Sequence, residues 1–260
     1  ASMRTLCAYS EIKEQTYNSP PSIESNKEMA AEILENAANR NQRTLGLESF
    51  DILKAYNIPV VATKITKTLP QTIDACEEIG YPVVMKIVSP DISHKSDVGG
   101  IRLNLQNADE VERAYHTMMS DVRRYMPDAH IAGVQVQKMV TGGKEVIIGM
   151  NRDVQFGPLL MFGLGGTYVE FLKDVSFAVA PINKDDAKHM VASIKTYPLL
   201  AGVRGEEPSD IDSIVDTLTK VSQMVVDFPQ ILEFEINPLM VLPDGQGCVA
   251  MDIRLTRGDE

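Results

Sequence analysis

Residues 81–105 read YPVVMKIVSPDISHKSDVGGIRLNL. A β-rich run at 82–88 carries one charged side chain, Lys86, and an alternating run at 101–105 follows a polar loop. A cation fixed on a strand, together with backbone N–H groups that glycine lets approach an anion, is one way to hold polyphosphate. The alternative is an ordinary β-hairpin whose lysine snorkels to solvent. The stretch therefore predicts two strands and a loop, with an anion as the candidate ligand.

The C-terminal end predicts a second strand pair. Residues 231–241 read ILEFEINPLMV, and VAMDIR at 249–254 follows a Pro-Asp-Gly turn. Alternation along the first strand places Glu235 and Asn237 on one face, with Asp252 available from the partner strand. Mg²⁺ takes hard oxygen ligands, usually one or two carboxylates plus substrate phosphates and water. These three residues are the predicted metal site; a solvated strand face is the alternative.

Three separated segments carry a family resemblance. They are VVMKIVSPDISHKSDVGG (83–100), VQKMVTGGKEVIIGMNRDVQFGPLLMFGLGG (136–166), and FEINPL with MDIR (234–239 and 251–254). Together they resemble the ATP-grasp module of ADP-forming acyl-CoA synthetases, especially the β subunit of ADP-forming acetate–CoA ligase. The resemblance covers residues 45–254. It implies an α/β (α+β) ATP-grasp fold of two lobes with the nucleotide between them, and ATP/ADP with Mg²⁺ as ligands.

The resemblance also implies roles for individual residues. In the family a Lys at the position of Lys86 contacts nucleotide phosphate, and the linker at 137–140 offers backbone groups to adenine. Lys138 stands where the family usually has glutamate, so the backbone contacts alone carry over there. Glu145 corresponds to the acid that binds the ribose hydroxyls, with an exposed strand charge as the alternative, and Arg152 could clamp phosphate with two parallel bonds. The expected nucleotide-binding residues are Lys86, Gly99, Gly100, Gln137, Lys138, Met139, Val140, Glu145 and Arg152.

His94 is the residue with the most chemical consequence. A neutral imidazole nitrogen can accept a phosphoryl group. The resemblance implies such a relay for acetate-type ligases, with a second, principal phosphohistidine on a CoA-binding partner. A histidine that only contacts phosphate or stabilises its loop is the alternative. The residues expected at the phosphoryl-transfer site are His94, Lys95, Gly165 and Gly166.

The expected activity is that of an acid–thiol ligase. The net reaction is acyl-CoA + ADP + phosphate ⇌ carboxylic acid + CoA + ATP. No G-x-G-x-x-G follows an early strand, so we expect the full reaction to need a CoA-binding α subunit or fused domain, in an α2β2-type hetero-oligomer. Two rivals stay open: an ATP-grasp carboxylate–amine ligase, and a nucleotide-sensing module that regulates an attached acyltransferase.

Composition excludes several other classes. The chain has 260 residues, 44% of them hydrophobic, which suits a globular α/β protein. A net charge of −11 argues against general nucleic-acid affinity. No apolar run approaches the ~20 residues of a membrane span. Three widely spaced cysteines form neither a disulfide framework nor a metal pattern, so we expect a cytoplasmic protein.

The expected domain order has four parts. Residues 1–24 form a flexible linker or tag remnant, and 25–64 form N-terminal helices and a first strand on the base, with Ser25 and Glu28 as a capping box. Residues 65–136 form the small lobe, and 137–260 form the large lobe with the Mg²⁺ site. Expected elements are helices at 45–56, 70–79, 107–125, 184–196 and 209–227, with strands at 60–63, 82–88 and 101–105 and more from 131 to 160.

Overall fold

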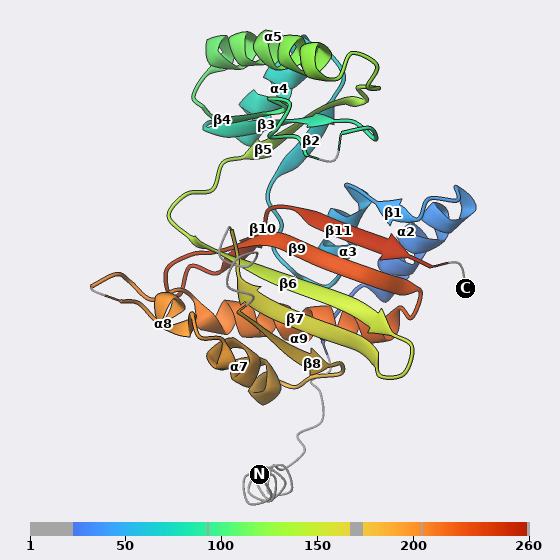
Figure 1. Cartoon of the computed structure of the whole chain (residues 1–260), viewed down its shortest axis with the longest axis vertical. Coiled ribbons are helices and arrows are strands. Elements are labelled where there is room, and N and C mark those ends of the chain that lie inside the picture. Colours follow the sequence, from blue (N-terminus) through green and yellow to red (C-terminus); the bar gives the residue numbers. More distant parts are fainter. Residues whose placement is uncertain (1–22, 93, 167–173, 204, 259–260) are drawn as a thin grey trace, which may run out of the picture. The chain divides into compact units, whose positions relative to one another are not determined.

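The computed structural model describes residues 23–92, 94–166, 174–203 and 205–258 (Figure 1). Contacts divide it into two compact units, a small unit at 60–142 and a large unit formed by the described residues on either side. The expected boundaries were 65 and 136. The small unit extends beyond them because its first and last strands pair with each other, and the Lys138 N–H donates to the Ala62 carbonyl at 3.0 Å. Most of the expected linker at 1–24 lies outside the described residues.

The small unit has the β-α-β-β-α-β order predicted from the sequence. Its four strands form an antiparallel sheet in the order β2-β5-β3-β4. The elements are β2 (Thr63–Thr66), α4 (Leu69–Ile79), β3 (Val83–Val88), β4 (Ile101–Leu105), α5 (Ala108–Tyr125) and β5 (Gly133–Lys138).

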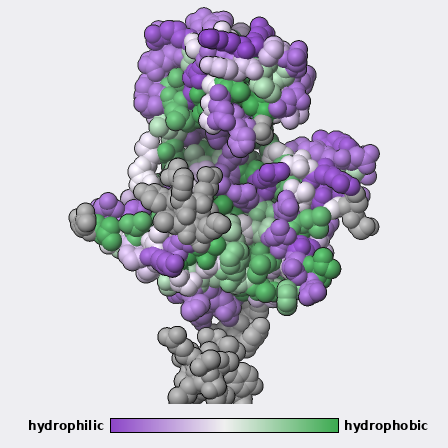
Figure 2. All heavy atoms as spheres, in the orientation of Figure 1, coloured by the Kyte–Doolittle hydropathy of each residue, from purple (hydrophilic) through white to green (hydrophobic). Residues whose placement is uncertain are grey.

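Alternation along β3 decides which face of the small sheet is covered. Val83, Met85 and Ile87 are fully buried and share a core with residues of α4 and α5. Lys86 has the opposite parity, so it lies on the face away from the helices. The outer surface of α5 is hydrophilic (Figure 2). The small unit thus packs one face of its sheet and carries its lysine on the other.

The large unit is built on a seven-stranded sheet in the order β1-β11-β9-β6-β7-β8, with β10 paired to β9. Its strands are β1 (Thr44–Leu45), β6 (Lys144–Asp153), β7 (Gly157–Leu164), β8 (Val175–Val179), β9 (Ile231–Val241), β10 (Cys248–Ala250) and β11 (Ile253–Arg257). Its helices are α2 (Lys27–Asn39), α3 (Glu48–Ala55), α7 (Lys184–Ser193), α8 (Tyr197–Leu200) and α9 (Ile211–Asp227). Helices α7 and α9 cover one face (Figure 1).

The covered face of the large sheet is apolar at every second position. Buried strand residues meet the apolar stripe of α9, as expected for a helix with one hydrophobic face. The residues are Val146, Ile148, Met150, Leu160, Phe162, Phe234 and Ile236 from the strands, and Ile214, Leu218, Val221 and Val225 from α9. The opposite face carries Glu145, Gly149, Glu233 and Glu235. It is therefore the face on which acidic side chains are available to a ligand.

Several expected elements differ in detail. The strand expected at 60–63 is β2 at Thr63–Thr66, and β1 precedes the helix expected at 45–56. The helix expected at 184–196 ends at Ser193 and α8 follows, because Asp174 accepts hydrogen bonds from the Lys195 and Thr196 N–H groups. None of the helices in the described part of the chain has the length and apolar character needed to cross a membrane.

The expected N-terminal capping box was also wrong. Asn26, not Ser25, caps α2, and its side chain accepts from the Met29 N–H at 3.1 Å. The helix is held on the base by Lys27, which donates to Asp227 at 2.7 Å. Tyr56 donates to the other oxygen of the same carboxylate at 2.8 Å. The first described helix is thus part of the large unit.

Candidate functional site

One end of the large sheet brings β6 and β7 together around Glu145. The Gly165 N–H donates to the Glu145 carbonyl at 2.7 Å. A Cβ on Gly165 would lie 2.9 Å from the Glu145 carbonyl carbon, so only glycine fits there. A Cβ on Gly166 would lie 3.5 Å from Glu145 Oε2. The glycine pair at 165–166 therefore lets the chain pass close to Glu145 and leaves its carboxylate beside the turn.

The neighbouring strand β9 is irregular at the same end of the sheet. Its register with β6 shifts between Val146 and Ile148. The Asn237 N–H donates to the Asp252 carbonyl at 3.0 Å, and Asn237 Nδ2 donates to Glu235 Oε1 at 2.9 Å. The three expected metal residues are therefore neighbours, and Glu235 and Asn237 share a face.

The oxygen atoms of this group suit Mg²⁺ with a phosphate ligand. Because Asn237 uses its nitrogen on Glu235, its amide is oriented with Oδ1 as the remaining acceptor. Asp252 Oδ1 accepts from the Ile253 N–H at 3.0 Å, which fixes that carboxylate at the start of β11. Among the described residues, no three His, Cys, Asp or Glu side chains gather in a way that would hold a metal. The Asn237 and Asp252 oxygens are of the kind that Mg²⁺ binds together with substrate phosphates and water.

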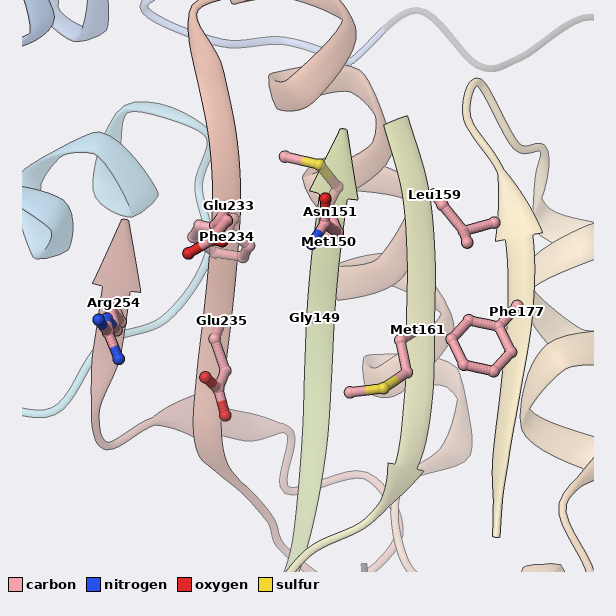
Figure 3. Close-up of a pocket in the computed structure, with 10 residues that line it drawn as sticks. All are labelled: Gly149, Met150, Asn151, Leu159, Met161, Phe177, Glu233, Phe234, Glu235 and Arg254. Atoms are coloured by element: carbon pink, nitrogen blue, oxygen red, sulfur yellow. The ribbon is translucent and has the colours of Figure 1, made fainter. Parts of the chain in front are cut away.

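A cavity of about 280 Å³ opens beside this group on the same face of the sheet (Figure 3). Glu235 lies opposite Arg254 in the pairing of β9 with β11, and both line the cavity. Met161 and Phe177 form an apolar wall, and Phe177 is 57% exposed. Sequence reasoning missed Met161, Phe177 and Arg254, because only the pairing of β7, β8 and β11 into one sheet brings them to the same cavity.

In the small unit, Lys86 lies on the helix-free face of the sheet. It is half-buried and pairs with Ile101 on one side and Gln135 on the other. Gln137 has the same parity as Gln135, and its Nε2 donates to Thr63 Oγ1 at 3.2 Å. On this face Lys86 is therefore flanked by Ile101 and by Gln135, and the two glutamines are buried.

The loop at 94–100 differs from the expected anion cradle. The Gly99 N–H donates to the Ser96 carbonyl at 3.1 Å, and the Gly100 N–H donates to the Lys95 carbonyl at 2.7 Å. These two donors are used inside the loop and do not face an anion. Gly100 is needed for another reason, because a Cβ there would lie 2.6 Å from Ile87 Cγ2. His94 is exposed and Lys95 is half-buried.

The segment at 137–140 is partly used by the fold. Lys138 Nζ donates to the carbonyls of Gly80 and Tyr81, at 3.0 and 2.7 Å, so its side chain serves the end of α4. The Met139 N–H donates to the Pro82 carbonyl at 3.0 Å. The side chain that replaces the family's glutamate is therefore engaged within the small unit.

Arg152 has a different role from the expected phosphate clamp. Its Nε donates to the Ile231 carbonyl at 2.9 Å, and one terminal nitrogen donates to Val225 at 2.6 Å and to Phe228 at 3.4 Å. Burial lowers the pKa of this guanidinium. The three carbonyls lie at the end of α9 and just beyond it, where a helix lacks internal partners. Arg152 therefore satisfies carbonyl groups at the C-terminal end of α9, and its hydrogen bonds serve the fold.

Comparisons with known proteins show the family and the fold of the chain. The family model described as an ATP-grasp domain matches residues 36–256. The chain is 48% identical over 226 residues to the acetate–CoA ligase [ADP-forming] I subunit beta of Pyrococcus furiosus, covering 87% of this chain and 97% of that subunit. It is 49% identical over 234 residues to acetate–CoA ligase [ADP-forming] I of Archaeoglobus fulgidus, covering 90% of this chain but only 34% of that protein.

A similar structure belongs to the dinucleotide forming acetyl-coenzyme A synthetase 1 of Ca. Korarchaeum cryptofilum. In complex with coenzyme A, Ca-AMPCP and HgCl⁺ it matches with a TM-score of 0.83 and 40% identity, covering 88% of this chain and all of that chain. With coenzyme A and Mg-AMPPCP, its phosphohistidine segment points towards the nucleotide binding site; that structure matches with a TM-score of 0.77 and 38% identity, over the same 88% and 100% of the two chains.

Proposed function

The chain belongs to the ATP-grasp family that contains the ADP-forming acetate–CoA ligases, and we propose that it is the nucleotide-binding, phosphoryl-transfer part of such an enzyme. The net reaction is acyl-CoA + ADP + phosphate ⇌ carboxylic acid + CoA + ATP. The observation that carries the proposal is the group at one end of the large sheet. There Glu145 lies beside the Gly165-Gly166 turn, and the bonded pair Glu235–Asn237 adjoins Asp252.

Each residue of this group has a defined task in the proposal. Asn237 and Asp252 hold Mg²⁺ through their oxygen atoms, and Glu235 orients Asn237 through the bond to its nitrogen. The metal, when bound, offsets the charge of the nucleotide phosphates. Glu145 accepts from the ribose hydroxyls, and the close passage of Gly165 and Gly166 keeps space open beside its carboxylate.

The small unit supplies the cationic residues of the proposal. Lys86 contacts a nucleotide phosphate from the helix-free face of its sheet. A half-buried lysine on an apolar strand is favourable when an anion meets it. His94 is exposed in its loop. Its neutral ring nitrogen takes the γ-phosphoryl group of ATP as the P–O bond to the β-phosphate breaks and ADP leaves, or the ring only contacts the phosphate.

The proposal includes a partner. The chain spans about a third of the Archaeoglobus relative and nearly all of the Pyrococcus beta subunit. The sites that bind CoA and the acid therefore belong to an α subunit or a fused domain, which carries a phosphohistidine to the nucleotide site. We place the assembly in the cytoplasm as an α2β2-type complex or its fused equivalent.

The test begins with Mg·ATP. The chain is incubated with Mg·ATP, and its intact mass and phosphosites are determined under conditions that preserve acid-labile phosphate, with His94→Ala alongside. Calorimetry measures Mg·ADP and Mg·ATP binding to both proteins. Phosphate on His94 supports the relay. Nucleotide binding without any phosphate in the wild type would demote His94 to a contact residue.

The partner is tested by reconstitution. Adding the CoA-binding subunit of a relative, with acetyl-CoA, ADP and phosphate, should give ATP. A chain that binds nucleotide yet forms no ATP with any such partner would instead favour the nucleotide-sensing role.

A further inference from the structure

Arg102 ties the turn of the 94–100 loop to a helix. One terminal nitrogen, Nη1, donates to the Gly99 carbonyl at 2.6 Å and to the Ile101 carbonyl at 2.9 Å, so it bridges both sides of Gly100. The other, Nη2, donates to Asp121 Oδ2 at 2.6 Å. Asp121 belongs to α5, and the two side chains are only 23% and 35% exposed. A fork with two ends bonded fixes direction as well as distance.

Glycine is required for this arrangement at position 99. Its backbone has φ +65°, and an added Cβ would lie 3.2 Å from both Cβ and Oδ2 of Asp121. The turn therefore touches the very carboxylate that Arg102 holds. Glycine here allows contact with a protein acid rather than with a bound anion.

The other end of the loop region is anchored separately. Asp91 Oδ2 accepts from the His130 N–H at 2.7 Å, and Ile92 is 5% exposed in the small-unit core. His94 stands between these two anchors and is exposed. Among the described residues, anchors thus lie on both sides of the one histidine to which the proposed function gives a chemical role.

We propose that Arg102 and Asp121 are positioning residues that set the place of His94 for phosphoryl transfer without themselves touching the nucleotide. This inference rests on the proposed function. Its physical basis is that a transferring group must be held in line with its acceptor, and that a displacement of ~1 Å can cost on the order of 100-fold in rate. Both guanidinium ends of Arg102 are bonded to protein, so its assigned role is to hold the loop.

The test uses Arg102→Lys, Asp121→Asn and Asp121→Glu in the full chain. Arg102→Lys keeps the charge but loses the fork, and Asp121→Asn keeps the shape but loses the charge. The matched control is Glu78→Gln, which removes a different ion pair of the same unit, Lys64–Glu78. For each protein we would measure thermal unfolding, the Kd for Mg·ATP, the rate of His94 phosphorylation, and amide hydrogen exchange at Gly99 and Gly100.

The expected result is a split between binding and rate. Arg102→Lys and Asp121→Asn should slow His94 phosphorylation by about 10- to 100-fold while the Kd stays within about twofold. Hydrogen exchange of the Gly99 and Gly100 amides should accelerate in these two variants. Asp121→Glu should recover part of the phosphorylation rate, and Glu78→Gln should match the wild type in phosphorylation rate, Kd and exchange.

Each of the following outcomes would overturn the inference. Phosphorylation at the wild-type rate in both Arg102→Lys and Asp121→Asn, or unchanged exchange at Gly99 and Gly100, would exclude the positioning role and leave the proposed function standing. A Kd weakened in step with the rate would make Arg102 a phosphate ligand instead. A wild-type chain that binds no nucleotide would count against the proposed function, and the inference would fall with it. A wild-type chain that binds nucleotide and never phosphorylates His94 would make His94 a contact residue and would overturn the inference alone.

Discussion

Two glycine pairs look alike in the sequence and do different work in the two units. In the small unit, the Gly99 and Gly100 amides bond within their own loop, and the turn packs against Ile87 and Asp121. In the large unit, Gly165 lies against the Glu145 backbone, and Gly166 lies beside the Glu145 carboxylate. The first pair closes a loop on itself, whereas the second makes room beside an acid. A glycine pair therefore indicates a close approach, and only the fold says what is approached.

The largest effect should come from the large unit, where the second glycine pair lies near the acidic residues of the proposed site. We expect Asp252→Ala to weaken Mg²⁺-supported nucleotide binding on the order of 100-fold, about 3 kcal/mol, because a carboxylate of the proposed Mg²⁺ site is lost. Calorimetry with Mg·ADP, and with ADP in EDTA, measures this. Asp244→Ala removes an exposed acid in the turn between β9 and β10 and is the control. Equal losses with and without Mg²⁺ would show that Asp252 does not serve the metal.

Gly165→Ala should come next and should affect both stability and binding. The added Cβ meets Glu145 backbone atoms at 2.9–3.0 Å, and backbone cannot rotate away. We expect a loss of about 2–3 kcal/mol in urea unfolding, together with weaker nucleotide binding. Unchanged nucleotide affinity in a folded variant would separate the glycine turn from the site.

Gly100→Ala should destabilise by about 2 kcal/mol, because its Cβ meets Ile87 Cγ2 at 2.6 Å and the Lys95 carbonyl at 2.9 Å. Unlike Gly165→Ala, it should leave the Kd for Mg·ADP near the wild-type value. The comparison breaks if Gly100→Ala weakens nucleotide binding more than Gly165→Ala does.

The smallest effect concerns the far end of the β7–β8 connection. Burial acts to raise the pKa of Asp174, but hydrogen bonds from Thr196 and the Lys195 N–H outweigh it and leave that pKa below its usual value. A lowered folded pKa gives stability that is present above the unfolded pKa of about 3.9 and is lost as pH falls through the folded pKa. Asp174→Asn should therefore lower the Tm at pH 7, and the gap from wild type should narrow below about pH 4. A gap that is constant from pH 7 to about pH 3 would exclude this linkage.

Much of the fold could be predicted because its signals are local. The small-unit order follows from β-branched runs between capped helices, and Asn107 caps α5 by accepting from the Glu110 N–H at 3.0 Å. The grouping of Glu235, Asn237 and Asp252 followed from alternation and a turn. Such features depend on neighbours within a few residues, which the sequence displays directly.

The rest depends on partners distant in the chain. Arg152 was expected to bind phosphate, yet its partners are carbonyls at 225, 228 and 231 that no spacing rule connects to it. Arg102 meets Asp121 only because α5 packs across the sheet. The capping error at Ser25 is smaller, since Ser25 and Asn26 are both good cap residues and tertiary packing chose between them.

The pairing of β2 with β5 has a consequence for how such a chain can be cut and rejoined. Entry to and exit from the small unit are hydrogen-bonded neighbours, Ala62 and Lys138. Residues 60–142 are therefore an insertion in the architectural sense, a module spliced into one loop of a host. In the large unit, the Pro59 carbonyl accepts a hydrogen bond from the Ala250 N–H of β10 at 2.9 Å, and Gly143 lies against Met240 of β9. Pro59 and Gly143, the residues on either side of the insertion, are separated by about three strand spacings of ~4.8 Å. A short glycine–serine linker in place of residues 60–142 should therefore join Pro59 to Gly143. Expressed separately, the large unit with this linker and the small unit should each fold around its own core.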